Sequence, residues 1–247
     1  MQRITGIGCV IVLLAAVSPV RAEDDAKLRA IITKAIKVHG GADKLTKLKG
    51  SITKTKGTFY GLGDGIEYTQ TISIQLPNRI RVDVDAPNFK FVQVFNGDKG
   101  WHKFGDNTTD MTKEQVTEAK EQMQAATITH LAVLTDKAYK LSALGETKVG
   151  DRAAVGVRVE REGHRPVSLF FDKDNSLLLK TETRGKDTMA DGKEFTAESL
   201  YSDHKKVDGL MVPYKIEVKR DGKKFVESEV TEVKFSEKLD DSVFAKP

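Results

Sequence analysis

The chain has 247 residues, of which 39% are hydrophobic and 31% are charged, a balance typical of a folded globular protein rather than a disordered one. Its 40 basic and 36 acidic residues give a net charge of +4 and are interspersed along the chain. No basic stripe that could follow a phosphate backbone is visible, so the sequence does not indicate nucleic-acid binding.

The first 22 residues have the features of a secretory signal peptide. Arg3 gives a basic start, residues 7–17 are apolar, and Val20-Arg21-Ala22 fits a cleavage site. A transmembrane anchor is the alternative, but the apolar run is shorter than the roughly 20 residues that span a bilayer. We therefore expect a periplasmic protein that begins at residue 23, with 38 basic and 36 acidic residues and a net charge of +2. Cys9 is the only cysteine and would be removed, which leaves no disulfide and no thiolate chemistry.

The mature chain is predicted to open with an amphipathic helix. Apolar residues recur at helical spacing from Leu28 to Ile36, and Gly40-Gly41 would end the helix. A second, short helical turn is expected from Ala42 to Leu48.

Alternation of apolar and polar residues then predicts two groups of strands. It is clearest from Ile66 to Leu76, because successive side chains of a strand point to opposite faces. The expected strands are 51–60, 66–76, 79–85, 89–95 and 100–104, and then 138–144, 154–161, 167–172, 177–184, 194–204, 210–220 and 223–235. Short turns join them, including a type I′ hairpin at Asp221-Gly222, so we expect an antiparallel meander.

Between the two groups, residues 111–134 have a helical pattern that Asp110 or Thr112 could cap. This helix could simply fill the concave side of the sheet, move as a lid over an apolar pocket, or dock on a membrane surface. The predicted fold is mainly β (α+β): a large curved antiparallel sheet that forms an incomplete barrel, with helices covering its concave face. No linker or repeat divides it, so residues 23–247 are predicted to form a single domain.

No catalytic or metal-binding constellation is visible. The five histidines lack metal-ligand spacing, and we interpret each as a surface or turn residue. Ser202-Asp203-His204 contains the residue types of a hydrolase triad, but neighbours on a strand face opposite ways. Asp240-Asp241 is interpreted as a turn cap in an apolar docking tail rather than a cation site. We expect no enzymatic activity, cofactor or metal.

Four stretches resemble the LolA-like superfamily of periplasmic outer-membrane lipoprotein-sorting carriers. They are KGTFYGLGDGI at residues 56–66, FVQVFNGDKGWHK at 91–103, YSDHKKVDGLMVPYKIEVKRDGK at 201–223 and EVTEVKFSEKLDDSVFAKP at 229–247. The order of the predicted elements also fits the family. The resemblance implies an unclosed barrel whose apolar concave face receives acyl chains of lipoproteins or other lipids. It transfers no individual binding residue to this sequence.

The expected function is therefore the transport or sorting of a lipid or lipoprotein towards the outer membrane, by a monomer that touches membranes only transiently. Candidate lining residues, taken from the apolar faces and the mid-chain helix, are Ile72, Ile74, Ile80, Val82, Phe89, Phe91, Trp101, Leu131 and Leu134. Ordinary core residues would have the same pattern. The alternative function is an envelope protein-interaction or stress-sensing module on the same fold, with a protein partner and no lipid transport.

Overall fold

The computed structural model describes residues 19–247 except 88 and 191, with the side chains of 19–23 omitted. Cys9 and most of the predicted signal peptide lie outside the described residues, and Val20-Arg21-Ala22 form part of the first turn of helix α1. Within the described part of the chain, no helix is both long and apolar enough to cross a membrane. The single domain over residues 23–247 stays a prediction.

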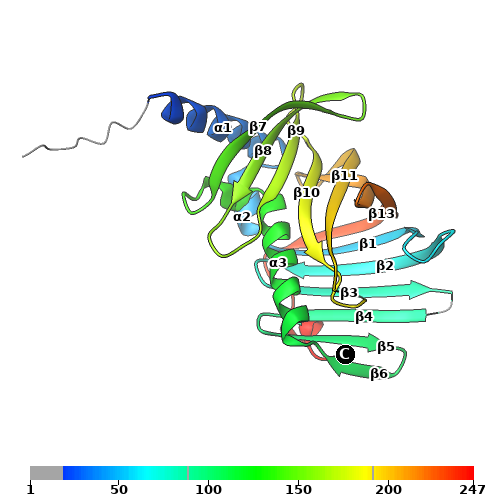
Figure 1. Cartoon of the computed structure of the whole chain (residues 1–247). Helices are drawn as coiled ribbons and strands as arrows, with labels where there is room; N and C mark the ends of the chain where they lie inside the picture. Colours follow the sequence, from blue (N-terminus) through cyan, green and yellow to red (C-terminus); the bar gives the residue numbers. More distant parts are fainter. Residues whose placement is uncertain (1–18, 88, 191) are drawn as a thin grey trace, which may run out of the picture.

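One antiparallel sheet dominates the described chain (Figure 1). Its thirteen described strands are β1 (Gly50–Phe59), β2 (Ile66–Gln75), β3 (Arg79–Ala86), β4 (Phe89–Asn96), β5 (Lys99–Phe104), β6 (Asn107–Asp110), β7 (Lys140–Val149), β8 (Arg152–Glu160), β9 (Val167–Asp172), β10 (Leu178–Lys186), β11 (Glu194–Val207), β12 (Leu210–Arg220) and β13 (Lys223–Ser236). The strand order is β6-β5-β4-β3-β2-β1-β13-β12-β11-β10-β9-β8-β7. Two meanders therefore meet at the β1–β13 pair, and β6 and β7 remain as separate edges, as expected for an incomplete barrel.

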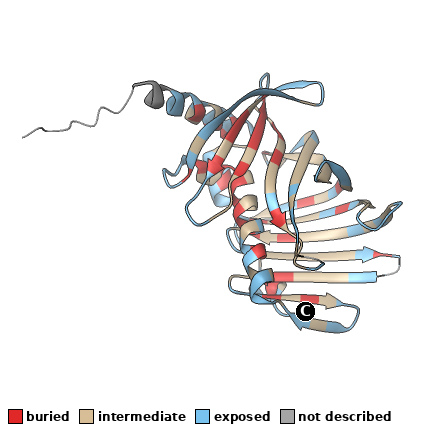
Figure 2. Ribbon diagram, in the orientation of Figure 1, coloured by how far each residue is buried: buried red, intermediate tan, exposed pale blue. Residues whose placement is uncertain are grey.

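The α-helices lie against one side of this sheet, and the C-terminal 3₁₀ turn η2 (Asp241–Phe244) packs on the other side, beside Arg81 and Asn96. The α-helices are α1 (Pro19–Val38), α2 (Ala42–Lys47) and α3 (Lys113–Thr129), and a further 3₁₀ turn is η1 (Ala132–Thr135). Helix α1 packs near β7, and α3 lies near β9 and β10. Figure 2 shows that buried residues gather on α3, β8 and β9.

The main core forms where helices α1 and α3 and the turn η1 meet strands β8 and β9. Ile32 of α1 and Ile128 at the end of α3 are almost completely buried, together with Leu169 and Phe171 of β9. The predicted helical spacing of Leu28, Ile32, Ala35 and Ile36 is confirmed, since all four are buried in this core. Burial of large aliphatic and aromatic side chains contributes about 1.5–3 kcal/mol each, so this core fixes the helices on the sheet.

The sequence-based boundaries lie within about three residues of the observed ones for most strands, and three differences are larger. Strand β6 was not predicted, because its residues Asn107–Asp110 are all polar and show no alternation. Strand β7 extends to Val149, past the predicted end at residue 144, because its second half is exposed and polar on an edge. The predicted helix 111–134 ends at Thr129, since Leu131 adopts a left-handed φ of 69° before η1.

Local signals at turns and caps are confirmed. Thr112 caps α3 in a reciprocal capping box with Gln115. Asp221 and Gly222 both have positive φ, as a type I′ hairpin requires. At the C-terminus Asp240 caps η2, and Phe244 is completely buried with its ring beneath the Arg79 guanidinium. The docking tail predicted for this segment is therefore present.

Candidate functional site: an open cavity across the sheet

A large open hollow among the described residues has a volume of about 1540 Å³. Its lining crosses the sheet from β5 to the β7–β8 turn, and includes Gly57, Tyr68, Phe89, Phe104, Tyr201, Ile216 and Ser228. Sites for drug-sized ligands measure roughly 300–1,000 Å³. The cavity therefore has room for a ligand larger than a typical small molecule.

Five lining residues form one row across the middle of the sheet. Tyr68 of β2 lies opposite Gly57 of β1, and Gly57 lies opposite Ser228 of β13. Ser228 in turn lies opposite Ile216 of β12, which lies opposite Tyr201 of β11. Directly opposed residues share a face of a sheet. The middle of the row thus has the small residues Gly57 and Ser228, and a tyrosine stands at each end.

Gly57 is required at this row by close backbone packing. A Cβ atom there would lie 2.1 Å from the carbonyl oxygen of Glu227 and 3.0 Å from the Cα atom of Ser228. Both are backbone atoms and cannot rotate away. Because glycine lacks a side chain, the Tyr68 ring can extend past it, and the Tyr68 hydroxyl forms a hydrogen bond with Ser228.

The two tyrosine hydroxyls belong to a lining that mixes charged, polar and apolar side chains. Burial raises the pKa of Tyr68, and burial also raises the pKa of Tyr201, so both phenols stay protonated at neutral pH. The Tyr201 hydroxyl lies 3.1 Å from the Thr181 hydroxyl of β10. The two hydroxyls thus point to different places, that of Tyr68 to Ser228 of β13 and that of Tyr201 to Thr181 of β10.

Aromatic side chains stand at one end of the cavity and remain open to solvent. Phe89 is 38% exposed and Phe104 is 49% exposed, and both line the cavity. Phe91 packs on Phe104 with ring centroids 4.6 Å apart. These rings present apolar surface to whatever enters the cavity.

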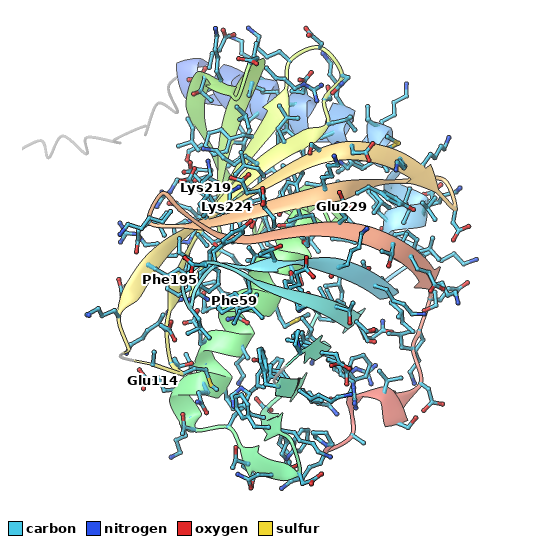
Figure 3. The ribbon with its side chains drawn as sticks, turned by 90° about the vertical axis from the view of Figure 1, so that its right-hand side faces the viewer. Phe59, Glu114, Phe195, Lys219, Lys224 and Glu229 are labelled. Atoms are coloured by element: carbon cyan, nitrogen blue, oxygen red, sulfur yellow. The ribbon has the colours of Figure 1, made fainter. Side chains whose placement is uncertain are left out.

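The charged residues around the cavity are largely paired. Lys90 lies 2.8 Å from Asp85, and the Lys56 ammonium lies 3.6 Å from the Glu229 carboxylate. Hydrogen bonds from Lys224 and from the Tyr60 hydroxyl lower the pKa of Glu227. Figure 3 labels Lys224 and Glu229, which lie at different points along β13. The rim therefore carries both signs of charge and does not favour a strongly charged ligand.

Ion pairs hold α3 against the second meander. One Arg165 nitrogen donates to both carboxylate oxygens of Glu118, at 2.8 and 3.0 Å, and Glu118 is almost fully buried. Glu121 accepts from the Arg165 backbone N–H and contacts the His164 ring nitrogen at 2.9 Å. On its other side, α3 packs Ala119 and Met123 on Phe95 of β4. The helix fills part of the concave side, and none of its residues lines the large cavity.

Of the nine predicted lining residues, Phe89 alone lines the cavity, and the other eight occupy four further places. Ile72 and Val82 are directly opposed, half-buried, and on the same face as Phe91. Ile74 and Ile80 lie beneath α3 and pack on the cluster of Phe95, Ala119 and Met123.

The remaining three predicted residues lie in the main core and on β5. Leu131 and Leu134 belong to the main core with α1, β8 and β9. Trp101 is paired with Val94, on the opposite face from its neighbour His102. A ligand-binding role for the nine residues stays a prediction.

The sequence reasoning did not select Gly57, Tyr68, Tyr201 or Ser228. Tyr68 belongs to the clearest alternating run, and this was the one available signal. A glycine and a serine carry no hydrophobic signal, and their place beside tyrosines becomes visible only in the register of five strands.

The histidines behave differently from the sequence-based interpretation. His102 is 5% exposed, and His39 has its two ring nitrogens bonded to the Ala35 carbonyl and the Leu178 N–H. Their assignment to exposed positions is wrong for His102, because its strand faces inward there. Among the described residues, no group of three or more His, Cys, Asp or Glu is arranged to hold a metal.

Comparison with solved structures identifies the fold. A LolA superfamily protein from Nitrosomonas europaea matches 89% of this chain and 97% of its own length, with a TM-score of 0.58 at 14% identity. This chain has the LolA-superfamily fold. A lipoprotein-sorting protein domain from Vibrio parahaemolyticus, described as putative, matches 90% of this chain and 97% of its own length (TM-score 0.54, 12% identity). A DUF1329 family protein from Desulfovibrio piger matches 88% and 97% (TM-score 0.57, 12% identity).

The likeness is confined to structure. No protein-family model matches the sequence, and no curated protein matches it. The resemblance to LolA-like proteins in the sequence analysis is thus confirmed at the level of the fold.

Proposed function

We propose that this protein is an exported, periplasmic carrier that binds acyl chains of a lipid or lipoprotein in the 1540 Å³ cavity. The observation that carries the proposal is the size of the cavity, combined with its exposed phenylalanines and its paired rim charges. The shared fold with a lipoprotein-sorting domain supports it. Sorting towards the outer membrane and a signal peptide at residues 1–22 are part of the same proposal.

Burial of an acyl chain would supply the affinity. Each buried CH₂ contributes about 0.8 kcal/mol, so a chain of about a dozen methylenes gains on the order of 10 kcal/mol before the cost of association. The Tyr68 hydroxyl, which lies by Ser228 near the middle of the row, would hold an ester or amide group there. No step of this role needs a catalytic group, and we propose binding and release without turnover.

Native mass spectrometry of protein purified without detergent, after expression of the full chain, tests the proposal. We expect added masses that disappear on organic extraction and are recovered as lipid. A bare protein mass, together with no saturable binding of a fluorescent fatty acid, contradicts the proposal. The next experiment would then be a pull-down from the envelope for a protein partner.

Two exposed apolar residues provide a matched pair of variants. Phe104 lines the cavity, whereas Leu144, which is 43% exposed, does not. Phe104→Asp should weaken binding of the fatty acid, and Leu144→Asp should leave it unchanged. Because both side chains are exposed, neither change should unfold the sheet. Equal effects of the two variants would contradict the assignment of the cavity.

A further inference from the structure

A second, small cavity lies between α3 and the turn that joins β10 to β11. Its volume is about 140 Å³. It is lined by Gln93 and His102 of the sheet, by Met111, Gln115, Glu118, Ala119 and Gln122 in or beside α3, and by Lys186, Asp187, Thr188, Met189, Phe195 and Arg220. None of these residues lines the 1540 Å³ cavity. The small cavity is therefore a separate feature, and a ligand bound there would be independent of the proposed carrier function.

The imidazole of His102 is the unusual group in this cavity. His102 is 5% exposed and lies directly opposite Gln93 on the adjacent strand. No hydrogen bond from another described residue reaches its ring nitrogens, and its ring contact is with Phe91. Burial lowers the pKa of His102, so the ring is neutral at neutral pH, with one nitrogen that donates and one that accepts. A buried polar group of this kind normally has a partner.

The charges around the cavity already neutralise one another. Glu118 is paired with Arg165, and Asp187 lies 3.1 Å from Arg220. Lys186 is paired with Glu114 at the start of α3, which Figure 3 shows below Phe195. With the charged side chains satisfied within the protein, an ion entering the cavity would find no opposite charge available. The ligand that fits is uncharged.

The groups left for a ligand can each donate and accept hydrogen bonds. Besides His102, the amides of Gln93 and Gln122 have no hydrogen bond within the described chain. Met111, Met189 and Phe195 add apolar side chains to the lining. A hydroxylated molecule with a carbon backbone matches both kinds of side chain.

The volume limits the size of this molecule. A cavity of about 150 Å³ can hold one benzene molecule, so 140 Å³ has room for a ligand of about six non-hydrogen atoms. A three-carbon polyol is of this size. We propose that the cavity is a binding site for a small uncharged polyol of the size of glycerol, held by His102, Gln93 and Gln122. The glycerol unit could be a free molecule or the end group of a glycerolipid.

Imidazole nitrogen NMR of the full chain tests the site directly. With ¹⁵N-labelled histidine, the His102 signals are assigned by their loss in His102→Gln. Glycerol should shift them in a saturable manner, while the signals of His164, which lies outside the cavity, stay in place. Propan-1-ol, which keeps one hydroxyl, should bind about tenfold more weakly, because two hydroxyls lose their hydrogen bonds. Saturation by 1-monooleoylglycerol at lower concentration than glycerol would identify the lipid source, and no such gain would identify a free polyol.

Two variants keep the test decisive. Ala119→Leu fills the cavity from α3 and should abolish the shift, and Gln122→Leu, at an exposed side chain, should weaken it without threatening the fold. Shifts that grow linearly with glycerol, or that persist unchanged in both variants, would show that the cavity holds water only and overturn the proposal.

Discussion

Substitution of Gly57 by alanine tests whether the spacing of β1 and β13 sets the floor of the large cavity. The new Cβ atom would meet the Glu227 carbonyl oxygen at 2.1 Å and the Ser228 Cα atom at 3.0 Å. An ordinary contact needs at least about 3.4 Å, so the two strands would have to separate by roughly 1 Å at the pair that joins the two meanders. The new methyl group would also disturb the hydrogen bond between the Tyr68 hydroxyl and Ser228.

The expected cost lies at the upper end of the range for overpacking, about 3 kcal/mol. For a chain of this length, that corresponds to a fall in Tm of about 6–12 °C. Urea unfolding followed by circular dichroism and by the fluorescence of Trp101, the only tryptophan, measures the free energy of unfolding. Trp101 lies on β5, away from the substituted pair, and so reports on the whole sheet rather than on the altered contact.

Gly105→Ala is the matched control. Gly105 has a positive φ of 56°, and a Cβ atom added there would have no other atom within 4 Å. Alanine at this position costs only the left-handed conformation, about 1 kcal/mol. If Gly57→Ala is no more destabilising than Gly105→Ala, the close approach of β1 and β13 does not constrain this position and the reasoning is refuted.

Three further outcomes are expected. Phe244→Ala should lower the free energy of unfolding by about 3–5 kcal/mol in urea unfolding, because it empties a completely buried site beneath the C-terminal tail. Arg165→Met should cost about 2–3 kcal/mol by the same measurement, since it leaves the buried Glu118 carboxylate without its cation, and Glu118→Gln in the same chain should recover part of the loss. Burial lowers the pKa of His39 and of His204, so the unfolded chain binds protons below about pH 6.5 while the native protein does not. Stability should then be full above pH 6.5 and fall as the pH drops towards the native pKa values, and urea midpoints measured between pH 7.5 and 5.5 should show a shallower slope for His39→Gln.

The sequence predicts the sheet well because most of its strands have one face towards solvent and one face towards the interior. The alternation from Ile66 to Leu76 corresponds to β2 within one residue, and the short turns correctly exclude parallel crossovers. The failures occur where alternation is absent. Strand β6 is wholly polar and is paired on one side only, so tertiary contacts alone define it.

The site is harder to predict than the fold because alternation does not distinguish an open face from a covered one. Ile74 and Val82 have the same pattern in the sequence, yet Ile74 is covered by α3 and Val82 is not packed against it. What decides between the two is where α3 crosses the sheet, and this depends on distant pairs such as Glu118 with Arg165. The residues next to Ile74 and Val82 in the sequence do not indicate where α3 crosses.

The large cavity stays open because the segments that could cover it pack at other places on the sheet. Helix α3 packs on β9 and β10 at one side and on Phe95 of β4 at the other, and the C-terminal turn η2 contacts β3 and β4. Phe89 and Phe104 are therefore left exposed at the cavity, although covering them would gain free energy. An apolar ligand in the cavity, as proposed above, would cover these rings. Because Phe104 is 49% exposed without a ligand, Phe104→Asp should change lipid binding more than stability.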